Sequence, residues 1–417
     1  MPQVLLIADD LTGATDSGAQ FARSGWRTLL VLEPGSPQEA DVLVLTSESR
    51  GLAGGAEAAR AVKNILAACS PASFPLVYKK IDSTLRGHPA AELAAVMSAL
   101  GEGRALIAPA FPAQGRITRD GRVLVNELPF EQTSFSREVP TGDLRRIFGE
   151  EANLLPLETI RGAESRLRAA LSEARGLLIA DAENDADLLR LARAALVQGV
   201  SLWCGSAGLA GALAACIGSN PEANKEPPHP TTRLPGHFLA VAGSLHPATA
   251  AQVAAARRAG AAVIQPPPEF FTHPLPQGAA ETAARLAGAL ADGRDAVLAV
   301  LSPADLSAGS DSSQSINGYA QSNVGVSPAQ IAARLAQTAA MALESAAPAG
   351  LLLTGGETAR AVCQTLGCTR LWLGGEVEPG IPWSRMVDGR FPGMRVVTKA
   401  GGFGNEESLV RALRFFD

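Results

Sequence analysis

Residues 4–18 read VLLIADDLTGATDSG, so an apolar run ends in two adjacent carboxylates, Asp9 and Asp10, before a Leu-Thr-Gly turn. The run predicts a buried strand over 4–8, and the small and polar residues after it predict a helix over 13–24. Open α/β sheets hold their ligands where the carboxyl ends of strands lead into helices. The stretch therefore predicts an α/β fold with acidic side chains at its ligand-binding edge.

The two acids have different expected positions, because side chains of an extended segment alternate between faces. We expect one of Asp9 and Asp10 to reach the ligand crevice and the other to brace the loop. Thr12 is placed to cap the helix, and Asp16 in its first turn suits the helix dipole. Capping throughout is the alternative, but capping needs one acid or hydroxyl, whereas DDLTGATD supplies several.

The same alternation of strands and helices continues on both sides of a proline-rich segment. Residues 218–236 hold five prolines, which neither a sheet interior nor a helix core accepts. We interpret this segment as a linker between domains 1–217 and 237–417, each a mostly parallel sheet flanked by helices. Strands are expected at 28–32, 42–46, 76–80, 105–108, 176–180, 200–204, 237–242, 262–265, 296–301, 350–354 and 395–399. Helices are expected at 56–68, 89–100, 163–173, 186–198, 206–217, 247–259, 278–291, 328–345 and 358–366.

Two segments depart from this alternation. Asp120-Gly121, between two short runs, predicts a hairpin over 116–126. Residues 302–326 are rich in Ser, Asn and Gly. We interpret them as a tolerated insertion, with a lid as the alternative.

The composition limits the classes of partner. The net charge is −5 and the 36 basic residues are spread thinly, which argues against nucleic acid. No apolar run approaches about 18 uninterrupted residues, so no membrane span is expected. The N-terminus carries neither a basic leader nor a small-residue cleavage site. These features predict a cytoplasmic protein that acts on small molecules.

A second polar cluster, YKKIDSTLRG at 78–87, follows another apolar run. Extended alternation would place Lys80, Asp82 and Thr84 on one face, with Arg86 in the turn toward the next helix. Two cations, an acid and two hydroxyls suit a small anionic polyol: Lys or Arg would take its carboxylate, and Asp82, Ser83 and Thr84 its hydroxyls. Further cations end neighbouring segments, Arg50 after VLVLTSES and Arg116 in APAFPAQGR. The alternative is a solvated strand end whose charges pair with one another.

Three glycine-containing turns follow expected strands in the second half: AGSLHPAT at 242–249, LTGGETA at 353–359 and KAGGFG at 399–404. Glycine lets phosphate approach bare backbone amides, and a following helix N-terminus adds partial positive charge. Together the turns favour a nucleotide-phosphate site, with ordinary strand–helix turns as the alternative. The chain lacks GxxxxGK[ST], the protein-kinase HRD and DFG motifs, GxGxxG and GxSxG. A P-loop ATPase, a Rossmann dehydrogenase and an α/β-hydrolase are therefore disfavoured.

IADDLTG, KKIDSTLRG, APAFPAQGR, GSLHPAT, TGGETA and KAGGFG, in this order from Asp9 to Gly404, resemble the motifs of the four-carbon acid sugar kinase family. The resemblance implies an N-terminal domain for the sugar acid and a C-terminal domain for ATP with Mg²⁺. It implies phosphorylation of the terminal, 4-hydroxyl of threonate, erythronate or 3-oxo-tetronate, and the first helix looks more like the threonate-type branch. The implied substrate-binding residues are Asp9, Asp10, Arg50, Lys80, Asp82, Ser83, Thr84 and Arg86. The implied ATP-binding residues are Ser244, Gly355, Gly356, Glu357, Thr358, Gly401, Gly402, Phe403 and Gly404.

The expected activity is therefore that of a phosphotransferase with an alcohol group as acceptor. Asp10 or Asp82 would accept the proton of the hydroxyl. Two alternatives stay open: a dehydrogenase or phosphatase acting on a small sugar acid, and a non-catalytic, nucleotide-gated sugar-acid sensor. The residues leave the metal ligands, the identity of the acid and the oligomeric state open.

Overall fold

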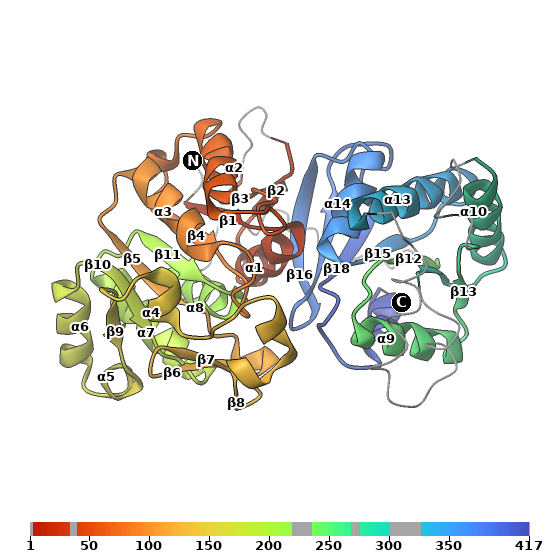
Figure 1. Cartoon of the computed structure of the whole chain (residues 1–417). Helices are drawn as coiled ribbons and strands as arrows, with labels where there is room; N and C mark the ends of the chain where they lie inside the picture. The colour runs from red at the N-terminus through yellow and green to blue at the C-terminus, as the bar shows by residue number, and fades with distance from the viewer. Residues whose placement is uncertain are drawn as a thin grey trace. The chain divides into compact units, whose positions relative to one another are not determined.

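The computed structural model describes residues 3–33, 40–218, 236–267, 270, 276–300 and 327–416. The chain divides into two compact units, Met1–Pro227 and Pro228–Asp417, and each is described by itself (Figure 1). The expected linker, apart from its end residues Gly218 and Gly236, lies outside the described residues, as does the Ser/Asn-rich segment at 302–326.

The first unit contains a sheet in which, among the described residues, eight strands are all parallel. Its strand order is β2-β3-β1-β4-β11-β5-β10-β9. The strands are β1 (Val4–Ala8), β2 (Thr28–Val31), β3 (Val42–Thr46), β4 (Leu76–Lys80), β5 (Arg104–Ala108), β9 (Asn153–Leu155), β10 (Gly176–Ala180) and β11 (Leu202–Gly205). The helices are α1 (Leu11–Arg23), α2 (Gly55–Ala67), α3 (Pro89–Leu100), α4 (Leu144–Phe148), α5 (Leu157–Arg161), α6 (Glu164–Glu173), α7 (Asp185–Val197) and α8 (Ala207–Ile217).

The topology of this sheet decides where a ligand site forms. Every residue of β1 is buried, as expected of a parallel strand covered on both faces. The chain leaves β1 toward β3 and β2 on one side and later returns to β4 on the other. Right-handed crossovers then place α1 and α2 on opposite faces, where α1 packs with α8 and α2 with α3. The carboxyl end of β1, flanked by β3 and β4, is thus a topological switch point.

The predicted hairpin is confirmed as part of a small antiparallel sheet. It consists of β6 (Arg116–Arg119), β7 (Arg122–Val125) and the short β8 (Leu128–Pro129). Asp120 and Gly121 both have positive φ, 52° and 70°, as a two-residue hairpin turn requires. Asp181 accepts hydrogen bonds from both of their backbone N–H groups.

The second unit contains a mixed sheet of order β13-β14-β12-β15-β18-β17-β16. The first five strands are parallel, and β17 and β16 continue the sheet antiparallel to their neighbours. The strands are β12 (Phe238–Ala242), β13 (Ala262–Ile264), β14 (Ala296–Ala299), β15 (Gly350–Thr354), β16 (Arg370–Glu378), β17 (Ile381–Met386) and β18 (Arg395–Lys399). The helices are α9 (Pro247–Arg258), α10 (Pro276–Ala291), α13 (Pro328–Ser345), α14 (Gly356–Thr365) and α15 (Ser408–Arg414).

Helices cover both faces of this sheet as well. Helices α9 and α15 pack together, while α13 packs with α10 and α14 (Figure 1). The core under α9 and α15 is aromatic: the Phe416 ring stacks on Phe238 at 5.7 Å between centroids and meets Trp383 edge-on at 5.6 Å. The α/β class and the mostly parallel sheets predicted from the sequence are confirmed.

Candidate functional site

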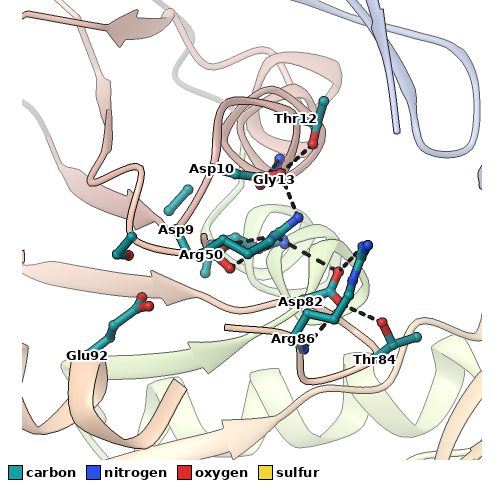
Figure 2. Close-up of polar contacts among 12 residues, drawn as sticks. Asp9, Asp10, Thr12, Gly13, Arg50, Asp82, Thr84, Arg86 and Glu92 are labelled. Atoms are coloured by element: carbon teal, nitrogen blue, oxygen red, sulfur yellow. Dashed lines mark hydrogen bonds and ion pairs between the residues drawn. The ribbon is translucent and has the colours of Figure 1, made fainter. Parts of the chain in front are cut away.

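The polar residues expected at the strand ends of the first unit form one connected cluster, shown in Figure 2. We call Asp9, Asp10, Arg50, Asp82 and Arg86 the strand-end cluster; they follow β1, β3 and β4. The Arg50 guanidinium binds both oxygens of Asp9, with Nε–Oδ2 at 2.7 Å and Nη2–Oδ1 at 2.9 Å. Its Nη1 also lies 2.5 Å from Asp10 Oδ2 and its Nη2 lies 3.9 Å from Asp82 Oδ1. Arg50 therefore links three carboxylates.

Asp9 and Asp10 both contact Arg50, so their side chains do not point to opposite faces as strand alternation predicts. Strict alternation fails because β1 ends at Ala8 and Asp10 already serves as the N-cap of α1. Asp10 Oδ1 accepts a hydrogen bond from Gly13 N at 2.7 Å. Thr12 is not the cap as predicted; its hydroxyl donates to Asp10 Oδ2 at 2.7 Å. Helix α1 consequently begins at Leu11, two residues before the expected start.

Asp82 forms the other half of the cluster. Arg86 binds it with two hydrogen bonds, Nε–Oδ2 at 2.8 Å and Nη2–Oδ1 at 3.1 Å, and Thr84 Oγ1 donates to Oδ2. Burial opposes the ionisation of Asp82, but Arg86 and Arg50 outweigh it and hold the pKa of this carboxyl well below its usual range. Burial likewise opposes ionisation of Asp9, while Arg50 lowers its pKa. Both groups are thus carboxylates at neutral pH.

Lys80 and Ser83 complete the set expected from the sequence. Lys80, the last residue of β4, is 4% exposed, and its Nζ makes no hydrogen bond or ion pair with any described residue. Ser83 is buried in the turn between Asp82 and Thr84. Arg116 lies further out over the Phe135 ring, 5.7 Å from its centroid, where burial lowers its pKa and Asp82 raises it. The sequence thus identified the charged residues that the fold gathers.

Two features of this site were missed. A Cβ on Gly13 would lie 2.6 Å from Asp10 Oδ1 and 2.9 Å from Lys80 Nζ, so with a larger residue here one or both of these side chains must shift. In the same unit, Lys79 Nζ forms a fully buried ion pair with Glu92 Oε2 at 2.7 Å. The sequence features that could have indicated these contacts are Gly13 within DDLTG and Glu92 in the first turn of α3. Neither spacing revealed what these residues would contact.

In the second unit, the three glycine-containing turns meet at the carboxyl ends of β12, β15 and β18. Ser244 follows β12, Gly355, Gly356, Glu357 and Thr358 follow β15 into α14, and Gly401, Gly402, Phe403 and Gly404 follow β18. A Cβ on Gly401 would overlap Ser244 Oγ, and one on Gly355 would lie 3.6 Å from Ser244 Cβ. Gly355 also has φ +91°. These approaches bring the backbone of all three turns together.

The central strand β12 lies between β14 and β15, so this convergence is again at a topological switch point. Glycine amides and the N-terminus of α14 suit an anion such as phosphate. Lys399 at the end of β18 is buried, and burial lowers its pKa to about 7, with Glu378 acting in the opposite direction. The residues present therefore fit the phosphates of a nucleotide.

Comparison with known proteins matches a different kind of domain to each of the two units. A family model described as a sugar-binding N-terminal domain matches residues 4–213, and one described as a nucleotide-binding C-terminal domain matches residues 239–409. A D-threonate kinase of Salmonella typhimurium is 33% identical, covering 100% of this chain and 98% of its own. A D-threonate kinase of Cupriavidus necator is 36% identical, and the match covers 98% of this chain and 96% of that protein. The chain belongs to the four-carbon acid sugar kinase family.

As a four-carbon acid sugar kinase family member, the chain is a small-molecule kinase, and the dehydrogenase, phosphatase and sensor alternatives are set aside. Other relatives are named D-erythronate kinase and 3-oxo-tetronate kinase, at 29% and 30% identity. A crystal structure from Salmonella typhimurium LT2 has the same fold, with a TM-score of 0.79 at 24% identity over 99% of both chains. Every helix in the described part of the chain is too short or too polar to cross a membrane.

Proposed function

We propose that this kinase uses ATP to phosphorylate the terminal 4-hydroxyl of a four-carbon sugar acid, with D-threonate as the first candidate. Both relatives quoted at 33% and 36% identity are named D-threonate kinase. We further propose that residues 1–217 bind the acid, that 218–236 link the two domains and that 237–417 bind the nucleotide. The observation that carries the proposal is the strand-end cluster, where Arg50 and Arg86 bind three carboxylates at the carboxyl ends of β1, β3 and β4.

Lys80 is proposed to bind the substrate carboxylate. The two arginines of the cluster are already bound to aspartates: Arg50 to Asp9 and Asp10, and Arg86 to Asp82. Lys80 is also buried beside this cluster, but it makes no hydrogen bond or ion pair with an aspartate within the described residues. A buried ammonium gains most from an anionic partner that arrives with the ligand. The hydroxyls of the polyol would then face Ser83, Thr84 and the aspartates.

Replacing Lys80 with Met tests this role. We expect Lys80→Met to raise the KM for D-threonate about 10- to 100-fold, the loss of one charge-assisted hydrogen bond, while the KM for ATP stays unchanged. Steady-state kinetics with each substrate varied in turn measure both constants. Lys63→Met, on the exposed face of α2, is the matched control and should match the wild type. A Lys80→Met enzyme with wild-type KM for the acid would refute the assignment.

Asp10 is proposed as the proton acceptor, and Asp82 as an anchor for Arg86. The Asp10 side chain is the most exposed of the three carboxylates, at 14% against 3% for Asp9 and 8% for Asp82. Asp82 has a strongly lowered pKa, so it binds a proton weakly. General bases contribute about 10²- to 10⁴-fold to rate.

Amide variants separate the two aspartates. Asp10→Asn should lower kcat by about 10²-fold or more. It should leave α1 intact, since Asn caps helices as well as Asp does. Asp82→Asn should act mainly on the KM for the acid, because Arg86 loses its carboxylate partner. Neither substitution should change the affinity for ATP. A larger loss of kcat in Asp82→Asn than in Asp10→Asn would reverse the assignment.

The nucleotide is proposed to lie with its phosphates on the turns at Ser244, Gly355–Thr358 and Gly401–Gly404. Mg²⁺ would accompany it, because Mg²⁺ in such sites is held largely by phosphate oxygens and water, and it would neutralise charge on the phosphates. Within the described residues, no group of three or more His, Cys, Asp or Glu side chains is arranged to hold a metal ion. Phosphoryl transfer depends chiefly on positioning and charge neutralisation, which the glycine turns and the cluster are suited to supply.

The whole proposal is tested by measuring ADP release with a panel of C4 aldonates, D-threonate, D-erythronate and 3-oxo-tetronate among them. We expect ATP-dependent turnover on at least one of these acids, with D-threonate giving the highest kcat/KM. Phosphorus NMR of the product should show the phosphate on the 4-hydroxyl. Absence of turnover on every acid, or a product phosphorylated elsewhere, would contradict the proposal.

A further inference from the structure

The turn at 400–405, which we call the glycine turn, has its carbonyl groups held by buried side chains. Lys399 Nζ donates to three of them: Ala400 O at 2.9 Å, Gly401 O at 3.0 Å and Phe403 O at 3.1 Å. An ammonium group has three hydrogens, and the three carbonyls use all of them. Lys399 is 1% exposed, so in its ammonium form its charge acts on the turn itself.

Helix α9 holds the same carbonyls from another direction. Thr249 Oγ1 donates to Gly401 O at 3.0 Å. Gln252 Nε2 donates to Phe403 O at 3.0 Å and to Asn405 O at 2.9 Å. Both side chains are buried, at 1% and 0% exposed. Six hydrogen bonds from three side chains therefore converge on one short turn.

Fixing the carbonyls also fixes the direction of the amides. In a planar trans peptide, the C=O of one residue and the N–H of the next point in opposite directions. With the carbonyls of Ala400, Gly401 and Phe403 turned inward, the N–H groups of Gly401, Gly402 and Gly404 are turned away from Lys399. None of these three N–H groups has a hydrogen-bond partner in the part of the chain that the structure describes. The turn thus presents unsatisfied backbone donors away from Lys399, and such donors can bind an anion.

The arrangement leaves one buried polar atom of α9 unsatisfied. Gln252 Oε1 has no hydrogen-bond partner among the described residues, because the side-chain amide directs its NH₂ group at the two carbonyls. A buried acceptor without a donor destabilises the fold. The contacts of Gln252 therefore favour a role in shaping the turn over a role in packing.

We propose that Lys399, Thr249 and Gln252 are positioning residues that hold the glycine turn with its amides toward the nucleotide phosphates, without contacting the nucleotide themselves. This inference rests on the proposed ATP site in the second unit. It predicts that substitutions in α9, behind the turn, weaken binding of the phosphates and leave binding of the nucleoside unchanged. If Lys399 instead contacted the phosphates directly, its contribution to phosphate binding would not depend on Thr249 or Gln252.

The test compares binding of ADP and adenosine to the full chain by titration calorimetry. Thr249→Val removes one donor without changing the size of the side chain, and Gln252→Glu replaces two N–H donors with an oxygen that repels the carbonyls. We expect each to weaken ADP binding about 5- to 10-fold or more, with adenosine binding and the KM for the sugar acid unchanged. Thr249→Ser keeps the hydroxyl and should restore wild-type affinity for ADP.

The outcomes separate the inference from the proposed function. A wild-type chain that binds no ADP and no ATP would defeat the proposed function itself. If the wild type binds ADP and folded Thr249→Val and Gln252→Glu variants bind it equally tightly, the positioning role is refuted. An equal loss of ADP and adenosine affinity would also refute it, since the turn would then not act on the phosphates.

Discussion

Replacing Gly13 with Ala should lower kcat/KM for the sugar acid by about 10²-fold or more while the protein stays folded. The added Cβ would lie 2.6 Å from Asp10 Oδ1 and 2.9 Å from Lys80 Nζ, closer than side-chain carbons come to other atoms. One or both groups must move, and a displacement of about 1 Å in a reacting site can cost 10²-fold in rate. Initial-rate kinetics with the acid varied would measure the effect.

The helix position of Gly13 makes this result easy to interpret. Ala favours an α-helix over Gly by about 0.8–1 kcal/mol, so the substitution should not weaken α1 through propensity. Gly103→Ala is the matched control in the same unit, because a Cβ there meets nothing within 4 Å. The affinity for ATP should be unchanged in both variants. A Gly13→Ala enzyme with wild-type kcat/KM would show that Asp10 and Lys80 do not converge as described.

Replacing Gly401 with Ala should produce the opposite pattern, with the loss confined to the nucleotide. Its Cβ would overlap Ser244 Oγ and lie 2.8 Å from Ser244 Cβ, so the turn after β18 must separate from the turn after β12. We expect the Kd for ATP to rise about 10²-fold, which corresponds to about 2.7 kcal/mol, with the KM for the acid unchanged. Equilibrium titration with ATP would measure it.

Gly288→Ala in α10 is the control for this variant, since a Cβ at that position meets nothing within 4 Å. It should bind ATP like the wild type. Thermal unfolding should show both proteins folded at the assay temperature. Unchanged ATP affinity in a folded Gly401→Ala protein would mean that the convergence of the two turns plays no part in nucleotide binding.

The charged residues of the strand-end cluster were predictable from the sequence because of a general property of parallel sheets. Polar residues that directly follow buried apolar runs collect at one edge, so the residues after β1, β3 and β4 are expected to lie together. Their pairing was not predictable. That Arg50 would bind Asp9 and Asp10 together, and Arg86 would bind Asp82, depends on backbone turns that the period of a strand does not describe.

The antiparallel strands β16 and β17 of the second sheet were not predicted, because glycine and proline residues interrupt their sequences. The β16 sequence RLWLGGEVE contains two glycines and β17 contains Pro382, features that weaken a strand prediction. The structure gives the reason for one of them, since a Cβ on Gly374 would overlap the Trp383 ring. The short elements β9, α4, α5 and α15 were missed because three to seven residues carry too little periodicity.

A crystal structure of the chain with D-threonate and a non-hydrolysable ATP analogue would test the central claim most directly. We expect the acid in the first unit, with its carboxylate within hydrogen-bond distance of Lys80 Nζ. We expect the phosphates of the analogue on the amides of Gly401, Gly402 and Gly404 in the second unit. Finding both ligands bound within the same unit would contradict the claim.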